Sequence, residues 1–138
     1  MSKYMKYMLI GMVLISFSNH GVQTPDERSL STALTAAAAM VNKSAPQMLD
    51  EETRLDSAAT FRNFIIYNNT MVNYSAEQLD ITLFDPLIQE SVIAPLCSNE
   101  KLSGFIELGV VMVYRYLGKN GAFITELSKD MATCNEAK

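Results

Sequence analysis

Two cysteines, Cys97 and Cys134, enclose a stretch whose second half has the pattern of a β-hairpin. Val110 to Leu117 is expected as a strand that is apolar on both faces, and residues 122–128 are expected as the returning strand. Asn120-Gly121 between them is the preferred pair for a tight type I′ turn, in which both residues take positive φ. A strand that is apolar on both faces is usually covered on both sides, or it leaves one side as a groove for a partner.

The first 21 residues have the three parts of a secretory signal peptide. Lys3 and Lys6 supply the positive start, Tyr7 to Phe17 is an uncharged apolar run, and small or polar residues follow it. The run is shorter than the about 20 residues that a membrane-spanning helix needs, and an uncleaved anchor is the alternative interpretation. Because no cysteine ends the run, lipid attachment there is excluded. We therefore predict a periplasmic or secreted protein with a signal peptide over residues 1–21.

Export decides how the two cysteines are interpreted. In an oxidising compartment, two cysteines in one exported chain are expected to form a disulfide. A bond between Cys97 and Cys134 would close a loop of about 36 residues and contribute roughly 3 to 4 kcal/mol on the chain-entropy account. The wide separation of the cysteines and the lack of a Cys-x-x-Cys pair argue against a redox role. We predict a structural disulfide.

Charge and composition exclude several classes of function. Without Lys3 and Lys6 the chain has 9 basic and 15 acidic side chains, a net charge of −6, and no cluster of Lys or Arg. Such a domain lacks the basic surface with which proteins bind nucleic acid. The single histidine, His20, lies at the edge of the signal segment, and two cysteines cannot complete a tetrahedral zinc site. We expect no nucleic acid, metal or cofactor, no catalytic residues, and membrane contact only through an uncleaved N-terminal segment.

Between the signal and the hairpin, the sequence predicts a helix, two strands and two further helices. Thr24-Pro25-Asp26-Glu27 has the form of a capping box and begins a helix that Pro46 stops. The strands are expected over Gln47–Ala58 and Phe61–Tyr74, and the last helix is expected over Asn99–Leu108.

The helix before Cys97 has three candidate starts, at Ser75, Asp80 and Asp85. Asp85-Pro86 is the sharpest of them, because proline at the first helical position loses only an N–H that is already unpaired. The buried stripe of this helix is expected at Leu83, Leu87, Ile88, Val92 and Leu96.

These elements together predict one α+β domain over residues 24–134, followed by a disordered tail over residues 135–138. The order is an N-terminal helix, a β-hairpin, a helix pair and a C-terminal β-hairpin. We expect a four-stranded antiparallel sheet with the helices packed on one face.

The arrangement around the cysteines resembles that of a known family. Cys97 is followed after eleven residues by Gly109, then by a hairpin that begins with Gly-Val and by Thr133-Cys134. This spacing, with Phe84-Asp85-Pro86-Leu87-Ile88 leading into Cys97, resembles the C-terminal half of the AspS-type pilotins of bacterial type II secretion. The resemblance covers roughly residues 60–134. It implies a small periplasmic α/β domain with a disulfide that matches Cys97 and Cys134.

The resemblance has one departure. A pilotin is a lipoprotein that travels with its secretin to the outer membrane, and this chain has no lipid-acceptor cysteine. Fold and compartment are therefore implied, while the piloting role is not. The stretches Leu49–Asp56 and Val72–Tyr74 also resemble a broader set of uncharacterised exported bacterial proteins with the same layout.

From these features we expect a non-enzymatic binding or assembly-accessory protein of the bacterial envelope. It would hold a helix or strand of an envelope partner, such as a secretion-system component, against its sheet. The candidate partner contacts are Tyr67, Tyr114 and Tyr116, because tyrosine suits half-buried interfaces. A periplasmic inhibitor or immunity protein of an exported enzyme is the alternative, and its size, acidity and disulfide also fit.

Overall fold

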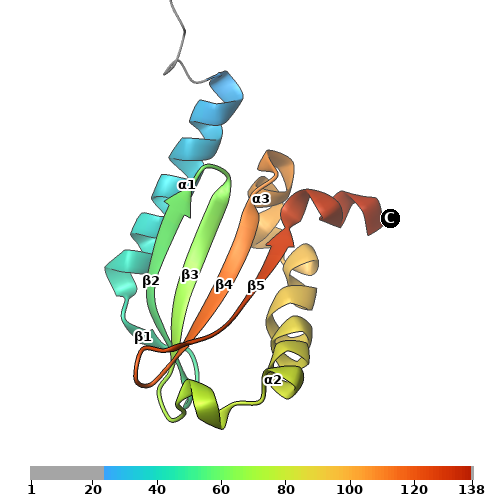
Figure 1. Cartoon of the computed structure of the whole chain (residues 1–138). Helices are drawn as coiled ribbons and strands as arrows, with labels where there is room; N and C mark the ends of the chain where they lie inside the picture. The colour runs from blue at the N-terminus through green and yellow to red at the C-terminus, as the bar shows by residue number, and fades with distance from the viewer. Residues whose placement is uncertain (1–23, 138) are drawn as a thin grey trace, which may run out of the picture.

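The computed structural model describes residues 24–137, so the signal peptide predicted at residues 1–21 lies outside the described residues. Figure 1 shows the order of the elements along the chain. They are α1 (Pro25–Ser44), β1 (Gln47–Met48), β2 (Thr53–Phe61), β3 (Phe64–Met71), η1 (Ala76–Gln78), α2 (Ile81–Ile88), η2 (Gln89–Ile93), η3 (Ala94–Ser98), η4 (Glu100–Leu102), α3 (Ser103–Leu108), β4 (Val111–Gly118), β5 (Phe123–Asp130) and η5 (Met131–Ala137). Residues 135–137, where a tail is expected, are included in η5.

The sheet has five strands in the order β1-β2-β3-β4-β5, and β3 pairs with β4 in parallel. The prediction of four antiparallel strands is therefore wrong in number and in one pairing. We call the helical segments from η1 to α3 the crossover. They begin at the end of the sheet where β3 stops and lead the chain back to the end where β3 starts (Figure 1). Because of this return, β4 must run in the same direction as β3.

The additional strand arises because the predicted strand over residues 47–58 is divided by a turn. The Asp50 carboxylate accepts hydrogen bonds from the backbone N–H groups of Glu52 (2.8 Å) and Thr53 (2.7 Å). Such an Asx-type turn reverses the chain, so that β1 folds back onto the first residues of β2 and Gln47 lies opposite Leu55.

The helix α1 begins as the capping box predicts. The Thr24 hydroxyl accepts a hydrogen bond from the Glu27 N–H (3.2 Å), and the Glu27 carboxylate accepts one from the Thr24 N–H (2.9 Å). Leu34, only 1% exposed, joins Ile65 of β3, Ile93 of η2 and Met112 of β4 in one core cluster. The helix and the crossover therefore pack on the same face of the sheet, as predicted.

The opposite side of the sheet faces the viewer in Figure 1, and we call it the open face. Strand residues that alternate with the core residues project there, including Phe64, Ile66, Val113 and Arg115. Within residues 24–137 no helix packs against this side. The domain is thus a two-layer α+β structure, with one face buried under helices and one exposed.

The crossover corrects the predicted start and the predicted buried stripe of its first helix. Asp80, not Asp85, caps α2, and its carboxylate accepts a hydrogen bond from the Thr82 N–H (2.9 Å). Leu83 (73% exposed) and Leu87 (58% exposed) lie on the surface, contrary to the prediction. Ile88 and Leu96 are buried as predicted, whereas Phe84 and Ile93, which were not predicted, are the other two buried residues of the crossover. The π-helical turn η2 adds one residue to the helical repeat, so that Ile93, five positions after Ile88, is buried where a continuous α-helix would bury Val92. In α2, which precedes this turn, Phe84 and Ile88 face the sheet, and Leu83 and Leu87 beside them therefore face outward.

The last part of the crossover follows the prediction more closely. The helix expected over Asn99–Leu108 is present as the short pair η4 and α3, and Asn99 caps its start. Gly109 ends it in the left-handed region at φ 64°, as predicted.

The C-terminal hairpin forms as predicted, but with a different turn. Gly121 has φ 83°, whereas Asn120 does not have positive φ, so the turn is not type I′. The Gly121 N–H donates to the Gly118 carbonyl (2.9 Å), and the Gly118 N–H donates to the Ala122 carbonyl (2.8 Å). A single left-handed glycine after a tight turn is the second common way to close a hairpin.

The predicted disulfide between Cys97 and Cys134 is confirmed. It joins η3 at the middle of the crossover to η5 after the last strand, with the two Cα atoms 5.3 Å apart. Cys134 itself lies in the core cluster with Leu34 and Ile65. None of the helices described over residues 24–137 is long and apolar enough to span a bilayer.

Asn42 near the end of α1 protects the outer edge of β2, and this contact generates a testable prediction. Its side-chain amide donates to the Ala58 carbonyl (2.9 Å) and accepts from the Ala58 N–H (2.8 Å). We expect Asn42→Ala to lower the free energy of unfolding by about 1 to 3 kcal/mol in urea denaturation, because a buried backbone pair loses its partner. Lys43→Ala, at the exposed neighbouring position, should change it by less than about 0.5 kcal/mol; equal effects would contradict this role.

The disulfide gives a second prediction. Cys97→Ala and Cys134→Ala should each lower the free energy of unfolding by roughly 3 to 4 kcal/mol, because each removes the same cross-link. The double variant should lose little more than either single one, since two residues that act through one bond are not additive. Equilibrium denaturation of the three variants tests this, and strictly additive losses would contradict the pairing.

Candidate functional site

A groove runs across the helix-covered face of the sheet, between the β1–β2 turn and the crossover. It consists of two hollows of ≈ 620 Å³ and ≈ 320 Å³, which share Leu49, Val92 and Tyr116 as lining residues. The larger hollow is lined further by Asp50, Glu52, Thr53, Met71, Tyr74, Leu79, Phe84, Leu87, Ile88 and Ser91, and the smaller by Leu55, Tyr67, Asn69, Leu96, Asn99, Leu102, Met112 and Tyr114. Because the two hollows share walls and floor, they form one continuous and mainly apolar groove.

The structure brings the three predicted tyrosines together on the floor of this groove. Tyr67 and Tyr114 face each other on the parallel strands β3 and β4, and their rings stack with centroids 5.1 Å apart. Tyr116 lies two residues further along β4 and is 3% exposed, and its ring packs in a T-shaped arrangement with that of Phe84, with the ring centroids 5.4 Å apart. Parallel pairing of β3 with β4 is what places these side chains in register on one face.

Burial raises the pKa values of the three tyrosines on the floor of the groove. Burial raises the pKa of Tyr67, and burial followed by the proximity of Tyr67 and Tyr116 raises the pKa of Tyr114 strongly. Burial, with a smaller effect of the Asp50 charge, raises the pKa of Tyr116 to about 12. All three phenols are therefore neutral at physiological pH and act as apolar rings with a polar end.

The two sides of the groove carry exposed aliphatic side chains that sequence reasoning did not select. Leu49, after β1, is 56% exposed, and Leu87 of α2 is 58% exposed. Leu83, one helical turn before Leu87, is exposed as well. The signal that could have identified them is that α2 is apolar on two faces: Phe84 and Ile88 fill the inner face, so Leu83 and Leu87 must lie outside.

The only charged residues that line the described groove are Asp50 and Glu52, at the end near the β1–β2 turn. The backbone N–H of Glu52 holds the pKa of Asp50 below its usual value, a trend that burial partly opposes. Glu52 accepts a hydrogen bond from the Tyr74 hydroxyl (2.9 Å). This end of the groove is therefore anionic, and it favours a cationic group in whatever occupies it.

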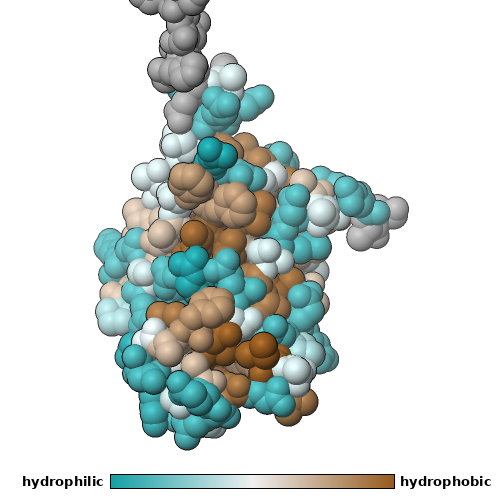
Figure 2. Space-filling view, in the orientation of Figure 1, coloured by the Kyte–Doolittle hydropathy of each residue, from teal (hydrophilic) through white to brown (hydrophobic). Residues whose placement is uncertain are grey.

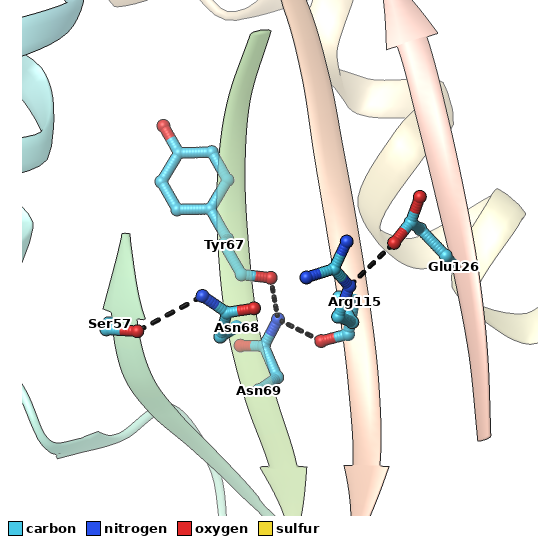
Figure 3. Close-up of polar contacts among 6 residues, drawn as sticks. All are labelled: Ser57, Tyr67, Asn68, Asn69, Arg115 and Glu126. Carbon is cyan, nitrogen blue, oxygen red and sulfur yellow. Dashed lines mark hydrogen bonds and ion pairs between the residues drawn. The ribbon is translucent and has the colours of Figure 1, made fainter. Parts of the chain in front are cut away.

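Further polar contacts join neighbouring strands of the sheet (Figure 3). Buried Asn69, 2% exposed, donates from one amide nitrogen to the carbonyls of Tyr67 (3.2 Å) and Arg115 (3.3 Å) and so bridges β3 and β4. On the open face Asn68 donates to the Ser57 hydroxyl (3.1 Å), and Arg115 pairs with Glu126 at 2.7 Å. These contacts stiffen the sheet beneath the groove. Among residues 24–137, no three His, Cys, Asp or Glu side chains are grouped to hold a metal ion.

Comparison with known proteins identifies the fold. No family model and no curated protein matches the sequence. Two solved structures that match are type II secretion pilotins: EpsS from Vibrio vulnificus, with a TM-score of 0.62 and 13% identity, and AspS from Vibrio cholerae, with a TM-score of 0.62 and 11% identity. The chain shares its fold with these pilotins.

The matches extend over most of each chain. The match to EpsS covers 79% of this chain and 94% of EpsS, and the match to AspS covers 79% and 95%. A third solved structure that matches is a predicted secreted protein from Pseudomonas aeruginosa, with a TM-score of 0.68 and 16% identity. This match covers 82% of this chain and 99% of the Pseudomonas aeruginosa chain. The resemblance to AspS-type pilotins that the sequence indicates is thus confirmed at the level of the fold.

The buried tyrosines predict sensitivity to alkali. Because the folded domain holds Tyr67, Tyr114 and Tyr116 neutral, their contribution to stability is complete below the usual pKa of about 10. It is lost as the pH rises above that value towards the raised pKa values of the folded state. Phenolate absorbance and circular dichroism, recorded together, should show these groups ionising only as the domain unfolds. Tyr116→Phe should delay the alkaline transition, and ionisation of Tyr67, Tyr114 and Tyr116 near pH 10 with the fold intact would contradict the assignment.

Proposed function

We propose that the domain is a non-enzymatic accessory protein of the bacterial envelope, and that its groove holds an apolar segment of an envelope partner. The observation that carries this proposal is the continuous apolar groove itself, with the Tyr67, Tyr114 and Tyr116 side chains on its floor. Exposed leucines flank that floor, and such aliphatic rims around a concave aromatic surface are typical of sites that bind another chain.

A helix fits the groove better than a strand. The floor is the face of paired strands, so it offers no unpaired backbone groups with which an incoming strand could form a ladder. A helix satisfies its own backbone hydrogen bonds and needs only apolar side chains on one face. The anionic end at Asp50 and Glu52 favours a basic residue near one end of that helix.

Three findings support the envelope as the location and a secretion component as the partner class. The disulfide is of the kind formed in oxidising compartments. Two of the proteins with the same fold are pilotins of type II secretion systems. The apolar run over residues 7–17 has the form of an export signal.

The groove can be tested by position-specific photo-crosslinking in cells of the source organism. A photoreactive amino acid in place of Leu49 or Leu87 should crosslink to one envelope protein, and mass spectrometry should place the crosslink in an apolar segment of it. The same probe in place of Phe61, an exposed residue of the open face, should not give this product.

If the groove binds an apolar segment, a charge introduced into its wall should weaken partner binding. Leu87→Asp should lower the amount of crosslinked or co-purified partner at least about tenfold, because it places a carboxylate in the apolar wall. Since Leu87 is exposed, the free energy of unfolding should change little, which urea denaturation checks. Undiminished capture by Leu87→Asp would contradict the proposal, and capture of an exported enzyme instead would favour an inhibitor.

A further inference from the structure

The two ends of the groove differ in chemistry, and we propose that the groove therefore accepts its helix in one direction only. The N-terminal turn of the bound helix lies at Asp50 and Glu52, and its C-terminal turn lies over the hydroxyl groups of Tyr67 and Tyr114. This direction deepens the function proposed above and rests on it, because a helix must occupy the groove for its two ends to be distinguished.

The end of the groove in the larger hollow offers hydrogen-bond acceptors. Asp50 and Glu52 line it, and ionised carboxylates accept hydrogen bonds but cannot donate them. Both side chains are held in place, Asp50 by the backbone N–H groups of Glu52 and Thr53 and Glu52 by the Tyr74 hydroxyl. The first turn of a helix has unpaired N–H groups and the positive end of the helix dipole, so it complements this end. The last turn, with its unpaired carbonyl groups, would meet like charge there.

The end in the smaller hollow offers hydrogen-bond donors. Tyr67 and Tyr114 line it, and among the tyrosine hydroxyl groups of residues 24–137 only that of Tyr74 has a hydrogen-bond partner within the protein. Asn99 lines the same hollow, and because its side-chain oxygen accepts from the Lys101 N–H (3.1 Å), its amide nitrogen can donate. A helix that covers these donors must supply acceptors, because a buried donor without a partner is unfavourable. The last four carbonyl groups of a helix are unpaired and meet this need.

The distance between the two ends matches a short helix. Met71 of the larger hollow and Tyr67 of the smaller one both lie on β3, four residues or about 13 Å apart. This length corresponds to about two and a half turns, so a helix of about 10 to 14 residues reaches both ends at once. Since β3 runs from the donor end towards the acidic end, the bound helix runs antiparallel to β3 and β4.

The middle of the groove does not select a direction. Leu49, Val92 and Tyr116 line both hollows, and apolar contacts with them are available to a leucine stripe in either orientation. The direction is therefore set by the two ends. The same chemistry favours a partner helix with lysine or arginine in its first turn, where the side chains reach the two carboxylates.

Two synthetic helices test the direction. Both are amphipathic peptides of about 14 residues with the same leucine stripe, blocked termini and a covalent staple on the polar face. One carries lysines in its first turn and the other carries them in its last turn. If the groove accepted both directions, the second peptide would bind reversed and equally well. We expect the first peptide to bind the disulfide-bonded protein at least about fivefold more tightly in fluorescence anisotropy, with a preference that salt weakens.

Paramagnetic labels locate the ends of the bound peptide directly. A nitroxide at the N-terminus of the first peptide should broaden the amide NMR signals of Asp50 and Glu52. A nitroxide at its C-terminus should broaden those of Tyr114 and Asn99 instead. The opposite pattern, or broadening at both ends by each label, would overturn the proposed direction.

Glu52→Gln separates the charge from the structure. The glutamine can still accept the hydrogen bond of the Tyr74 hydroxyl, and the preference for the first peptide should fall at least about twofold. Glu51→Gln removes an equal charge from the exposed neighbouring residue, which does not line the groove, and should leave the preference unchanged. Tyr67→Phe combined with Tyr114→Phe should weaken binding of the first peptide at least about threefold, because the last carbonyl groups of the helix lose their donors.

The open face, over which apolar and polar side chains are mixed, supplies a control surface (Figure 2). Phe61→Asp on that face should leave binding unchanged, whereas Leu87→Asp in the groove should weaken binding of both peptides. Equal affinities of the two peptides, or an unchanged preference in Glu52→Gln, would overturn the direction alone. Failure of both peptides to bind, or binding that Leu87→Asp leaves unchanged, would overturn the helix-binding groove together with the direction.

Discussion

The bond between Cys97 and Cys134 is the constraint on which the groove most depends. It fastens the middle of the crossover to η5, and thereby to the end of β5, at a point where Cys134 is itself part of the core. The crossover consists of short helical segments, including a π-helical turn and a proline-bearing 3-10 turn, and such segments would be marginally stable alone. The covalent link compensates for this and holds one wall of the groove at a fixed distance from the sheet.

The second constraint is the return of the chain between β3 and β4. A parallel pair needs a crossover over one face of the sheet, and here α1 and the crossover share that face. Beside the β1–β2 turn the crossover leaves part of this face uncovered, and that part becomes the groove with Tyr67, Tyr114 and Tyr116 as its floor. Because all the described helices pack on this side, the opposite side of the sheet remains open. The parallel connection between β3 and β4 therefore gives rise to both the groove and the open face.

The comparison with the pilotins shows how little identity this fold requires. At 11% and 13% identity to AspS and EpsS, the chain matches their fold over 79% of its length. A fold of this kind depends on the spacing of apolar residues more than on their identity. A shared fold does not by itself transmit function. The aromatic floor, the leucines beside it and the acidic end are therefore the features by which the partner of this chain should be sought.

The sequence alone was sufficient to predict the capped helix α1, the strand regions, the helix end at Gly109 and the disulfide. Each depends on residues close in the chain or on the compartment. The sequence also named the three tyrosines, although it could not show that β3 and β4 align them. Tertiary structure alone decided the parallel pairing, the fifth strand, the Asp80 start and the exposure of Leu83 and Leu87. The physical reason is that the spacing of apolar residues along the chain indicates a helix, whereas contacts with strands distant in sequence determine which side of that helix is buried.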